Sequence, residues 1–154
     1  AAARNDGALP ELEGLGPDPL SELTPESLLS AMNSSRAPIK AFLLDQRRVA
    51  GLGNIYVCEA LFRARIHPKR AANRVGKDAV ALVEAIRHVL TLGIENRGTT
   101  LRDYVDGEGN EGGNTSALQV YGREGEPCLV CKAAIRRRVD AGRSTFFCPR
   151  CQRR

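Results

Sequence analysis

The sequence has no tryptophan, and its aromatic residues amount to only 5%. This content is too low for the row of stacking side chains that a platform for single-stranded nucleic acid needs. The sequence also lacks an apolar run near the length of about 18 residues that crosses a membrane, so no membrane partner is predicted. No basic stretch followed by an apolar core stands at the N-terminus, which argues against secretion and favours the cytoplasm. The chain begins at Ala1 without a methionine, so we expect a fragment or a processed chain.

The 154 residues have the composition of a globular protein, with 42% hydrophobic and 27% charged residues. No internal repeat is present. The length suits one domain or two small modules, and it is sufficient to bury a core.

Positive charge is concentrated in two segments of the chain. Residues 36–77 hold ten basic and two acidic residues, and residues 128–154 hold eight and one. The segments 1–35, 78–97 and 98–127 are acidic on balance, so the net charge is only +5. If the two basic segments converge in the fold, they form a patch for a polyanion, most often nucleic acid. Two unrelated basic surfaces are the alternative.

Four of the five cysteines have the spacing of a zinc site: two C-x2-C pairs, separated by sixteen residues, formed by Cys128, Cys131, Cys148 and Cys151. A tight turn in each pair aims both thiolates at one ion, and four thiolates leave Zn²⁺ no open position, so the predicted zinc is structural. A disulfide or redox pair is the alternative, which a cytosolic chain disfavours. Cys58 is predicted to be a small buried hydrophobe rather than a reactive thiol.

Between the cysteine pairs the sequence predicts a hairpin, with strands at 133–139 and 143–147 around a turn at 140–142. Arg143 directly follows this turn, a position from which its guanidinium can bind a DNA phosphate. A solvated surface arginine is the alternative.

The stretch between Pro38 and His67 predicts two helices joined by a glycine turn. Pro38 suits the first turn of the first helix, which is expected to end before Gly51. The second helix is expected to end near His67 and carries the apolar residues Ile55, Val57, Cys58, Leu61 and Phe62. The glycine turn exposes backbone N–H groups at the N-terminus of the second helix. This end of a helix carries partial positive charge and attracts anions. Asn54 adds an amide donor there or acts as a plain N-cap.

Two further helices are expected. Thr24 and Pro25 mark the start of a short acidic helix whose acidity argues against DNA contact, and its apolar side is formed by Leu28, Leu29 and Met32. A long helix ends at residues 96–98 and carries a stripe of Val80, Val83, Ile86, Leu90 and Ile94. The predicted fold class is therefore mainly α, a helical bundle followed by a four-cysteine zinc β-hairpin finger.

Several runs of residues resemble the bacterial formamidopyrimidine-DNA glycosylases. The helical part resembles the helix–two-turn–helix module of that family in residues 39–46, 49–56, 59–62 and 66–68. The tail is similar to the zinc finger that closes those enzymes, in residues 120–128 and 142–152. The similar segments follow one another in the family's order from residue 15 onward.

The resemblance implies a DNA-repair enzyme that excises oxidised purines, such as 8-oxoguanine and formamidopyrimidines, from double-stranded DNA and nicks the abasic strand by β,δ-elimination. The base must be flipped out, because the reacting carbon is shielded in the stack. In the family an N-terminal proline attacks that carbon and the adjacent glutamate supplies protons. The nitrogen of Pro10, which precedes Glu11, is locked in a peptide bond. We therefore expect the DNA-binding part of a monomeric, nucleoid-associated bacterial enzyme, inactive by itself.

The resemblance also implies roles for single residues. Asn54, beside Gly53, matches an asparagine that holds a phosphate next to the flipped nucleotide. Arg143 matches a finger arginine that grips flanking phosphates and donates the proton for δ-elimination. Lys40 matches a lysine near the lesion that assists the reaction on 8-oxoguanine, and Arg36 is a candidate contact to the DNA backbone. For the last two, a plain surface charge is the alternative.

The resemblance divides the chain into a linker at 1–20 from a missing catalytic β-sandwich, a helical DNA-binding domain at 21–118 and a zinc finger at 119–153. The family's lesion loop falls at 106–117, where this sequence has no aromatic after the glycines. The segment is expected to act either as a lid or as a flexible linker.

Three other functions stay open on the sequence. A sister family that removes oxidised pyrimidines shares both modules, although residues 54–56 and 66–68 favour the purine enzyme. A non-catalytic binder of damaged or abasic duplex DNA and a zinc-ribbon protein-interaction domain are the remaining alternatives. Steep salt dependence of binding would exclude the last of these.

Overall fold

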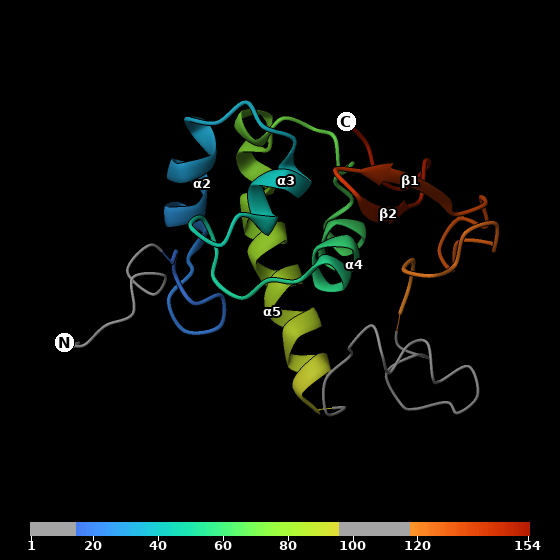
Figure 1. Cartoon of the computed structure of the whole chain (residues 1–154), viewed down its shortest axis with the longest axis horizontal. Helices are drawn as coiled ribbons and strands as arrows, with labels where there is room; N and C mark the ends of the chain where they lie inside the picture. Colours follow the sequence, from blue (N-terminus) through green and yellow to red (C-terminus); the bar gives the residue numbers. More distant parts are fainter. Residues whose placement is uncertain (1–14, 96–117) are drawn as a thin grey trace.

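The computed structural model describes residues 15–95 and 118–154, whose elements are arranged as Figure 1 shows. The helical part consists of α2 (Pro25–Asn33), α3 (Ile39–Leu44), α4 (Asn54–Ala64), two 3₁₀ turns, η1 (Ala72–Arg74) and η2 (Gly76–Asp78), and α5 (Ala79–Glu95). The tail holds an antiparallel hairpin of β1 (Arg136–Asp140) and β2 (Arg143–Phe147). The predicted fold class, mainly α with a terminal four-cysteine hairpin, is confirmed.

Helix α2 begins where the sequence predicts. The Thr24 hydroxyl accepts from the backbone N–H of Ser27, and the Ser27 hydroxyl accepts from the N–H of Thr24, so the two residues form a capping box. Pro25 occupies the first turn, where a missing N–H is harmless. The apolar side of the helix is buried at Leu28 and Met32, and it packs against α5 (Figure 1).

Helix α3 is shorter than predicted, because it ends at Leu44 rather than just before Gly51. Asp45 is extended, and its carboxylate accepts a hydrogen bond from the N–H of Arg47. Such a local bond gives the backbone an alternative to the helix. The apolar residues Val49 and Leu52 after Leu44 are still buried, but they reach the core from the connection between α3 and the next helix.

Helix α4 begins at Asn54 with Gly53 as its N-cap and ends at Ala64, three residues before His67. Arg65 ends it in the left-handed conformation, with a φ of 64°. Figure 1 shows α4 between α5 and the hairpin, and it contacts both. It is therefore buried on two sides, which explains why seven of its eleven residues are buried.

Helix α5 lies at the centre of the helical part, and its predicted apolar stripe is only partly right. Val83 and Ile86 are buried, but Val80 and Ile94 are 52% and 66% exposed. Leu82 and Val89 take part in the core instead, because α5 is packed by α2 and α4 together. No helix within 15–95 and 118–154 combines the length and the apolar character that crossing a membrane requires.

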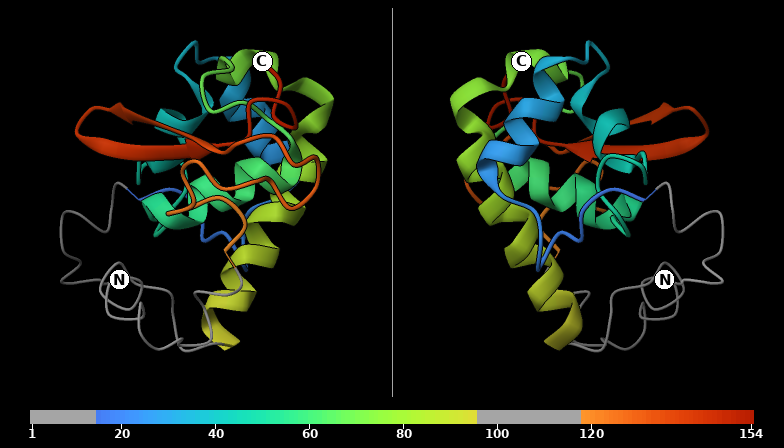
Figure 2. Two further views of the ribbon diagram at one scale, coloured as in Figure 1. Left: turned by 90° about the vertical axis from the view of Figure 1, so that its right-hand side faces the viewer. Right: turned by 90° about the vertical axis from the view of Figure 1, so that its left-hand side faces the viewer.

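The hairpin turns through Ala141 and Gly142, which both have positive φ angles of 50° and 80°. Two such residues make the type I′ turn that matches the twist of paired strands. The turn places Asp140 directly across from Arg143. The predicted strands are confirmed, although β1 begins at Arg136 rather than at 133. Figure 2 shows the hairpin projecting beyond the helices with its turn at the free end.

The finger and the helical part share a second apolar cluster. Ile55, Cys58 and Phe62 of α4 pack against the finger residues Val120, Tyr121, Ile135 and Phe146 and the zinc-site cysteines. At the other end of α4, the buried Gln152 donates from its amide to the carbonyl of Ile66 at 3.0 Å, and the N–H of His67 donates to the carbonyl of Arg153 at 2.9 Å. The finger is therefore held along the whole length of α4.

Candidate nucleic-acid interface and zinc centre

The four predicted zinc ligands converge on one point. The sulfur atoms of Cys128, Cys131, Cys148 and Cys151 all lie within 4.8 Å of one another. The Cys128–Cys151 and Cys131–Cys148 sulfur pairs are 3.8 and 3.4 Å apart. A tetrahedral zinc with bonds of about 2.3 Å holds its sulfurs about 3.8 Å apart, so the four thiolates fit this ion. They form a structural zinc site without an open position.

Backbone donors support the two cysteine pairs. The N–H of Val130 donates to Cys128 Sγ at 3.3 Å, and the N–H groups of Arg150 and Cys151 donate to Cys148 Sγ at 3.4 and 3.3 Å. Hydrogen bonds to a sulfur favour its charged form, which is the form that binds metal. The local turns of the finger thus prepare its thiolates for the ion.

The two basic segments of the sequence do converge, at the carbonyl of Ser144 in β2. Asn54 reaches this oxygen from the start of α4, with its amide nitrogen at 2.9 Å. Lys40 reaches it from α3, with Nζ at 3.5 Å. Both contacts lie next to Arg143, whose side chain is exposed at the hairpin turn. Three of the predicted site residues are therefore brought together, although about a hundred positions separate the first from the last.

Arg143 lines two cavities. The first, of about 470 Å³, is lined by Gly53, Asn54, Ile55, Tyr56, Tyr121, Gly142, Arg143 and Ser144. The second, of about 340 Å³, is lined by Pro38, Lys40, Ala41, Leu44, Asp45, Pro68, Lys69, Asp140, Ala141 and Arg143. The first combines a helix N-terminus with a guanidinium, which together attract an anion.

Asn54 is not the N-cap of α4, so that alternative is wrong. It is the first helical residue, and its amide nitrogen donates to Ser144 instead of its oxygen capping a backbone N–H. The same nitrogen lies 3.5 Å from the hydroxyl of Tyr121. The Asn54 side-chain oxygen is buried and has no hydrogen-bond partner among the described residues. Tyr121, which the sequence-based prediction missed as a site residue, lines this cavity with Asn54.

Lys40 is a buried residue rather than a surface charge. Only 4% of it is exposed, and its Nζ donates to the Thr145 hydroxyl at 2.7 Å. Burial lowers the pKa of Lys40, and the nearby charge of Arg143 acts in the same direction, while Cys58 and Asp140 oppose the shift. A buried ammonium must be paired with polar partners, and here these come from β2.

Glu59 is a second buried charge, and the sequence-based prediction missed it. Its carboxylate accepts from the backbone N–H groups of Gln119, Val120 and Tyr121, at 2.7, 2.9 and 2.8 Å. Burial raises the pKa of Glu59, although these three donors oppose the shift. A signal existed, because Glu59 shares a helical face with the apolar Ile55 and Phe62.

Cys58 is 2% exposed, and burial raises the pKa of its thiol to about 11. It therefore stays protonated at neutral pH, which confirms the prediction of a small buried residue.

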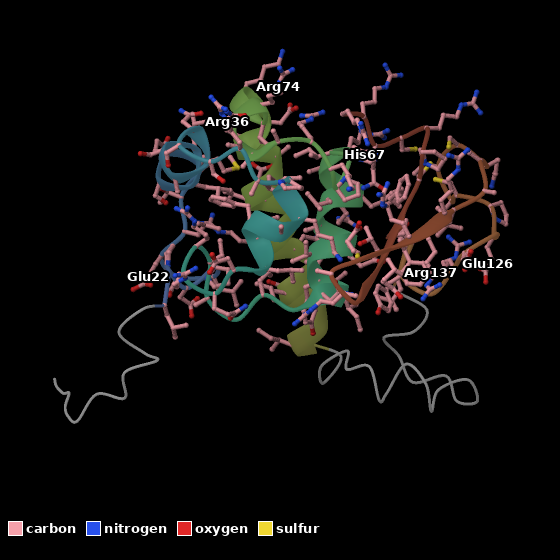
Figure 3. The ribbon with its side chains drawn as sticks, turned by 45° about the horizontal axis from the view of Figure 1, so that its top comes forward. Glu22, Arg36, His67, Arg74, Glu126 and Arg137 are labelled. Atoms are coloured by element: carbon pink, nitrogen blue, oxygen red, sulfur yellow. The ribbon has the colours of Figure 1, made fainter. Side chains whose placement is uncertain are left out.

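Arg36 does not share the surface of the other predicted residues. It is exposed in the loop between α2 and α3, where Ser35 and Asn73 are joined by a backbone hydrogen bond. In Figure 3 it lies near Arg74 at the upper edge, away from Arg137 of the finger. The predicted lesion loop at 106–117 lies outside the described residues, as does the first part of the predicted linker.

Comparison with known families gives two matches. Residues 15–105 match the formamidopyrimidine-DNA glycosylase H2TH domain, and residues 125–154 match the zinc finger found in FPG and IleRS.

Among curated proteins, a formamidopyrimidine-DNA glycosylase from Rhizorhabdus wittichii is 54% identical over 143 residues, covering 92% of this chain and 53% of that protein. One from Carboxydothermus hydrogenoformans is 48% identical, covering 93% and 55%. The chain thus spans about half the length of the curated relatives it matches.

Solved structures agree with these matches. The MutM (Fpg) protein of Thermus thermophilus superposes with a TM-score of 0.83 at 46% identity, covering 94% of this chain and 56% of that one. The Lactococcus lactis Fpg in complex with DNA containing an abasic site superposes with a TM-score of 0.82 at 37% identity, covering 94% and 54%.

Proposed function

Because the chain belongs to the formamidopyrimidine-DNA glycosylase H2TH domain family, we propose that it is the DNA-binding part of a bifunctional DNA glycosylase and abasic-site lyase. Its substrate is duplex DNA with an oxidised purine, and the product strand is nicked by β,δ-elimination. The proline nucleophile and its neighbouring glutamate belong to the remainder of the protein. The observation that carries the proposal is the convergence of Asn54, Lys40 and Arg143 around the Ser144 carbonyl.

Asn54, Gly53 and Arg143 hold a backbone phosphate in the cavity of about 470 Å³. The start of α4 contributes its positive dipole end, and the guanidinium contributes a planar pair of donors. The Asn54 amide turns from the Ser144 carbonyl toward the phosphate when DNA enters. Tyr121, whose hydroxyl lies 3.5 Å from that amide, stays at the cavity wall.

Arg143 donates the proton of the second elimination step, as the family arginine that it matches does. Its position is compatible with this role, because it is exposed at the hairpin turn and lines both cavities. Lys40 assists the reaction on 8-oxoguanine from the second cavity. Burial and the hydrogen bond to Thr145 of β2 hold its ammonium in one place there. Arg36 contacts the backbone outside both cavities. Zinc supplies no chemistry in this scheme, and it keeps the hairpin folded against α4.

The proposal is tested by titrating this chain with a duplex that contains an abasic-site analogue, at two salt concentrations. We expect salt-sensitive binding, because neutralised phosphates release counterions. Arg143→Ala removes the charged hydrogen bonds of the guanidinium. Because each such bond contributes about 10- to 150-fold, the substitution is expected to weaken binding by at least about 10-fold and to lower the salt slope by about 1. Asn54→Ala weakens binding without changing the slope, because the amide is neutral.

Arg150→Ala is the matched control, since Arg150 is an exposed arginine of the same finger and lines neither cavity. Equal losses of affinity in Arg150→Ala and Arg143→Ala would mean that binding depends only on overall positive charge, and this result would contradict the proposal. Borohydride trapping on an abasic duplex tests whether the nucleophile lies outside this chain. No adduct is expected, and a trapped adduct would place a nucleophilic amine within these residues.

A further inference from the structure

The hairpin turn contains a carboxylate that connects the two basic segments of the chain. Asp140 is the only acidic residue in 128–154. Its Oδ1 lies 3.3 Å from Arg138 Nε and 3.8 Å from Lys69 Nζ. Its Oδ2 accepts from the Thr145 hydroxyl at 2.9 Å. One carboxylate is therefore surrounded by cations from β1 and from the loop after α4.

Thr145 links this carboxylate to Lys40. Thr145 is 1% exposed, and its hydroxyl both accepts from Lys40 Nζ and donates to Asp140 Oδ2. An ammonium can only donate and an ionised carboxylate can only accept, so the single hydroxyl hydrogen has to point at Asp140. The chain of hydrogen bonds therefore has one direction, from Lys40 through Thr145 to Asp140.

This direction matters because Lys40 is buried, at 4% exposed. A long lysine side chain ordinarily samples many rotamers, but here Thr145 and the Ser144 carbonyl hold two of its three donors. If Asp140 did not accept the Thr145 hydrogen, that buried hydroxyl would keep a donor without this acceptor and would rotate toward another one. The hydroxyl oxygen would then no longer be held in the position from which it accepts from Lys40.

We propose that Asp140 is a positioning residue, which acts through Thr145 to hold the Lys40 ammonium at the cavity beside Arg143. The inference rests on the proposed function for the consequence in DNA, but the hydrogen-bond chain itself can be tested without DNA. The negative charge of Asp140 also offsets part of the positive charge of the two basic segments, which allows them to pack together. Asp140 lines the same cavity as Lys40 and Arg143, and it belongs neither to the two apolar clusters nor to the four zinc-site cysteines.

The first experiment follows the Lys40 ammonium by ¹⁵N NMR, with its signal assigned by its loss in Lys40→Arg. The amide of Asp140→Asn keeps one oxygen, which the cations Arg138 and Lys69 attract, so that its NH₂ group faces Thr145 and cannot accept the hydroxyl hydrogen. Asp140→Asn and Thr145→Val are therefore expected to speed hydrogen exchange of the Lys40 ammonium about fivefold, which is the effect of one ordinary hydrogen bond. Thr145→Ser keeps the hydroxyl and is expected to retain slow exchange. Asp45→Asn is the matched control, because Asp45 lines the same cavity but accepts from Arg47 instead.

The outcome that overturns the inference is a Lys40 exchange rate in Asp140→Asn that equals that of the original chain or of Asp45→Asn. An equal effect of Thr145→Ser and Thr145→Val would overturn it too, because the hydroxyl would then be irrelevant. Melting curves of all variants show whether the fold survives. If Asp140→Asn does not fold, the comparison of Thr145→Val with Thr145→Ser decides the inference. Asp140→Glu keeps the carboxylate and is expected to retain slow exchange.

The second experiment measures binding to an undamaged duplex and to one with an abasic-site analogue. Asp140→Asn removes a negative charge from the DNA-facing side, so its affinity for the undamaged duplex does not fall, whereas a damaged fold would lower both affinities. The preference for the abasic analogue is expected to fall about fivefold, and Lys40→Met is expected to remove this effect of Asp140→Asn. If the effects of Lys40→Met and Asp140→Asn on this preference add up in the double variant, the proposed link between Asp140 and Lys40 is contradicted. If the original chain binds neither duplex, the proposed function fails, and the exchange rates alone decide the inference.

Discussion

Replacing Glu59 by alanine is the most informative perturbation of the joint between the finger and α4. In the intact protein one carboxylate, 4% exposed, accepts three backbone N–H groups from 119–121. Two of these, at Val120 and Tyr121, belong to buried residues, whereas Gln119 is partly exposed and can turn to water. Glu59→Ala therefore takes the carboxylate acceptor away from two buried backbone donors.

Each unsatisfied buried donor costs about 1–3 kcal/mol, so the structure predicts a loss of about 2–6 kcal/mol. Part of this is offset, because the intact protein bears the cost of burying a carboxylate, which raises the pKa of Glu59. We expect a net loss near 3 kcal/mol. For a chain of this size that is a large part of the total stability.

The loss is measured by urea unfolding of the zinc-loaded protein, followed by far-UV circular dichroism. Glu84→Ala is the matched control, since Glu84 is an exposed glutamate on α5 and its removal should change stability by no more than about 0.5 kcal/mol. A Glu59→Ala variant as stable as Glu84→Ala would refute the reasoning. It would mean that the N–H groups at 119–121 find other partners at no cost.

Three further predictions concern pH, packing and zinc. Burial, together with the charges of Arg154, Arg138 and other nearby cations, lowers the pKa of His67, so the unfolded chain binds more protons. Stability is therefore complete above about pH 6.5 and falls as the pH drops through the folded pKa; His67→Asn, which keeps an acceptor for the Lys69 N–H, should lose that slope in pH-dependent unfolding. Gly93→Ala would gain about 1 kcal/mol of helix propensity, but its new Cβ would lie 2.8 Å from Tyr56 Cε1 and closer still to the hydroxyl. We expect a net loss of stability in thermal melts, and an unchanged or raised melting temperature would show that Tyr56 moves freely. Removing zinc with a chelator should unfold the finger and abolish DNA binding, while Co²⁺ in its place should give thiolate charge-transfer bands, and a finger that stays folded without metal would contradict a structural zinc.

Features that depend on neighbouring residues were predictable. The spacing of the cysteine pairs, the capping residues at Thr24 and the turn before Arg143 all act within a few positions, and each appears as predicted. Prediction failed where a local hydrogen bond outweighed a pattern. The Asp45 carboxylate ends α3 early, although the apolar residues continue.

The candidate site divides in the same way. Residue types and motifs singled out Asn54, Arg143 and Lys40, but they did not reveal that Lys40 is buried or that Asn54 donates to the finger. They also passed over Tyr121 and Glu59, whose partners lie about sixty positions away. Arg36 was grouped with the others by its charge and its nearness to α3, and only the fold separates it from both cavities.

By itself, the sequence determined the fold class, the four ligands of the zinc site, the start of α2 and the two basic segments. These follow from spacing, turn chemistry and composition, which act over short distances along the chain. Only the tertiary structure decided which side of α5 is buried, where the charges of Lys40 and Glu59 find partners, and that both basic segments meet at one carbonyl of β2. The reason is physical: a buried polar group must be satisfied by whatever the packed chain brings to it, and packing joins residues that the sequence keeps far apart.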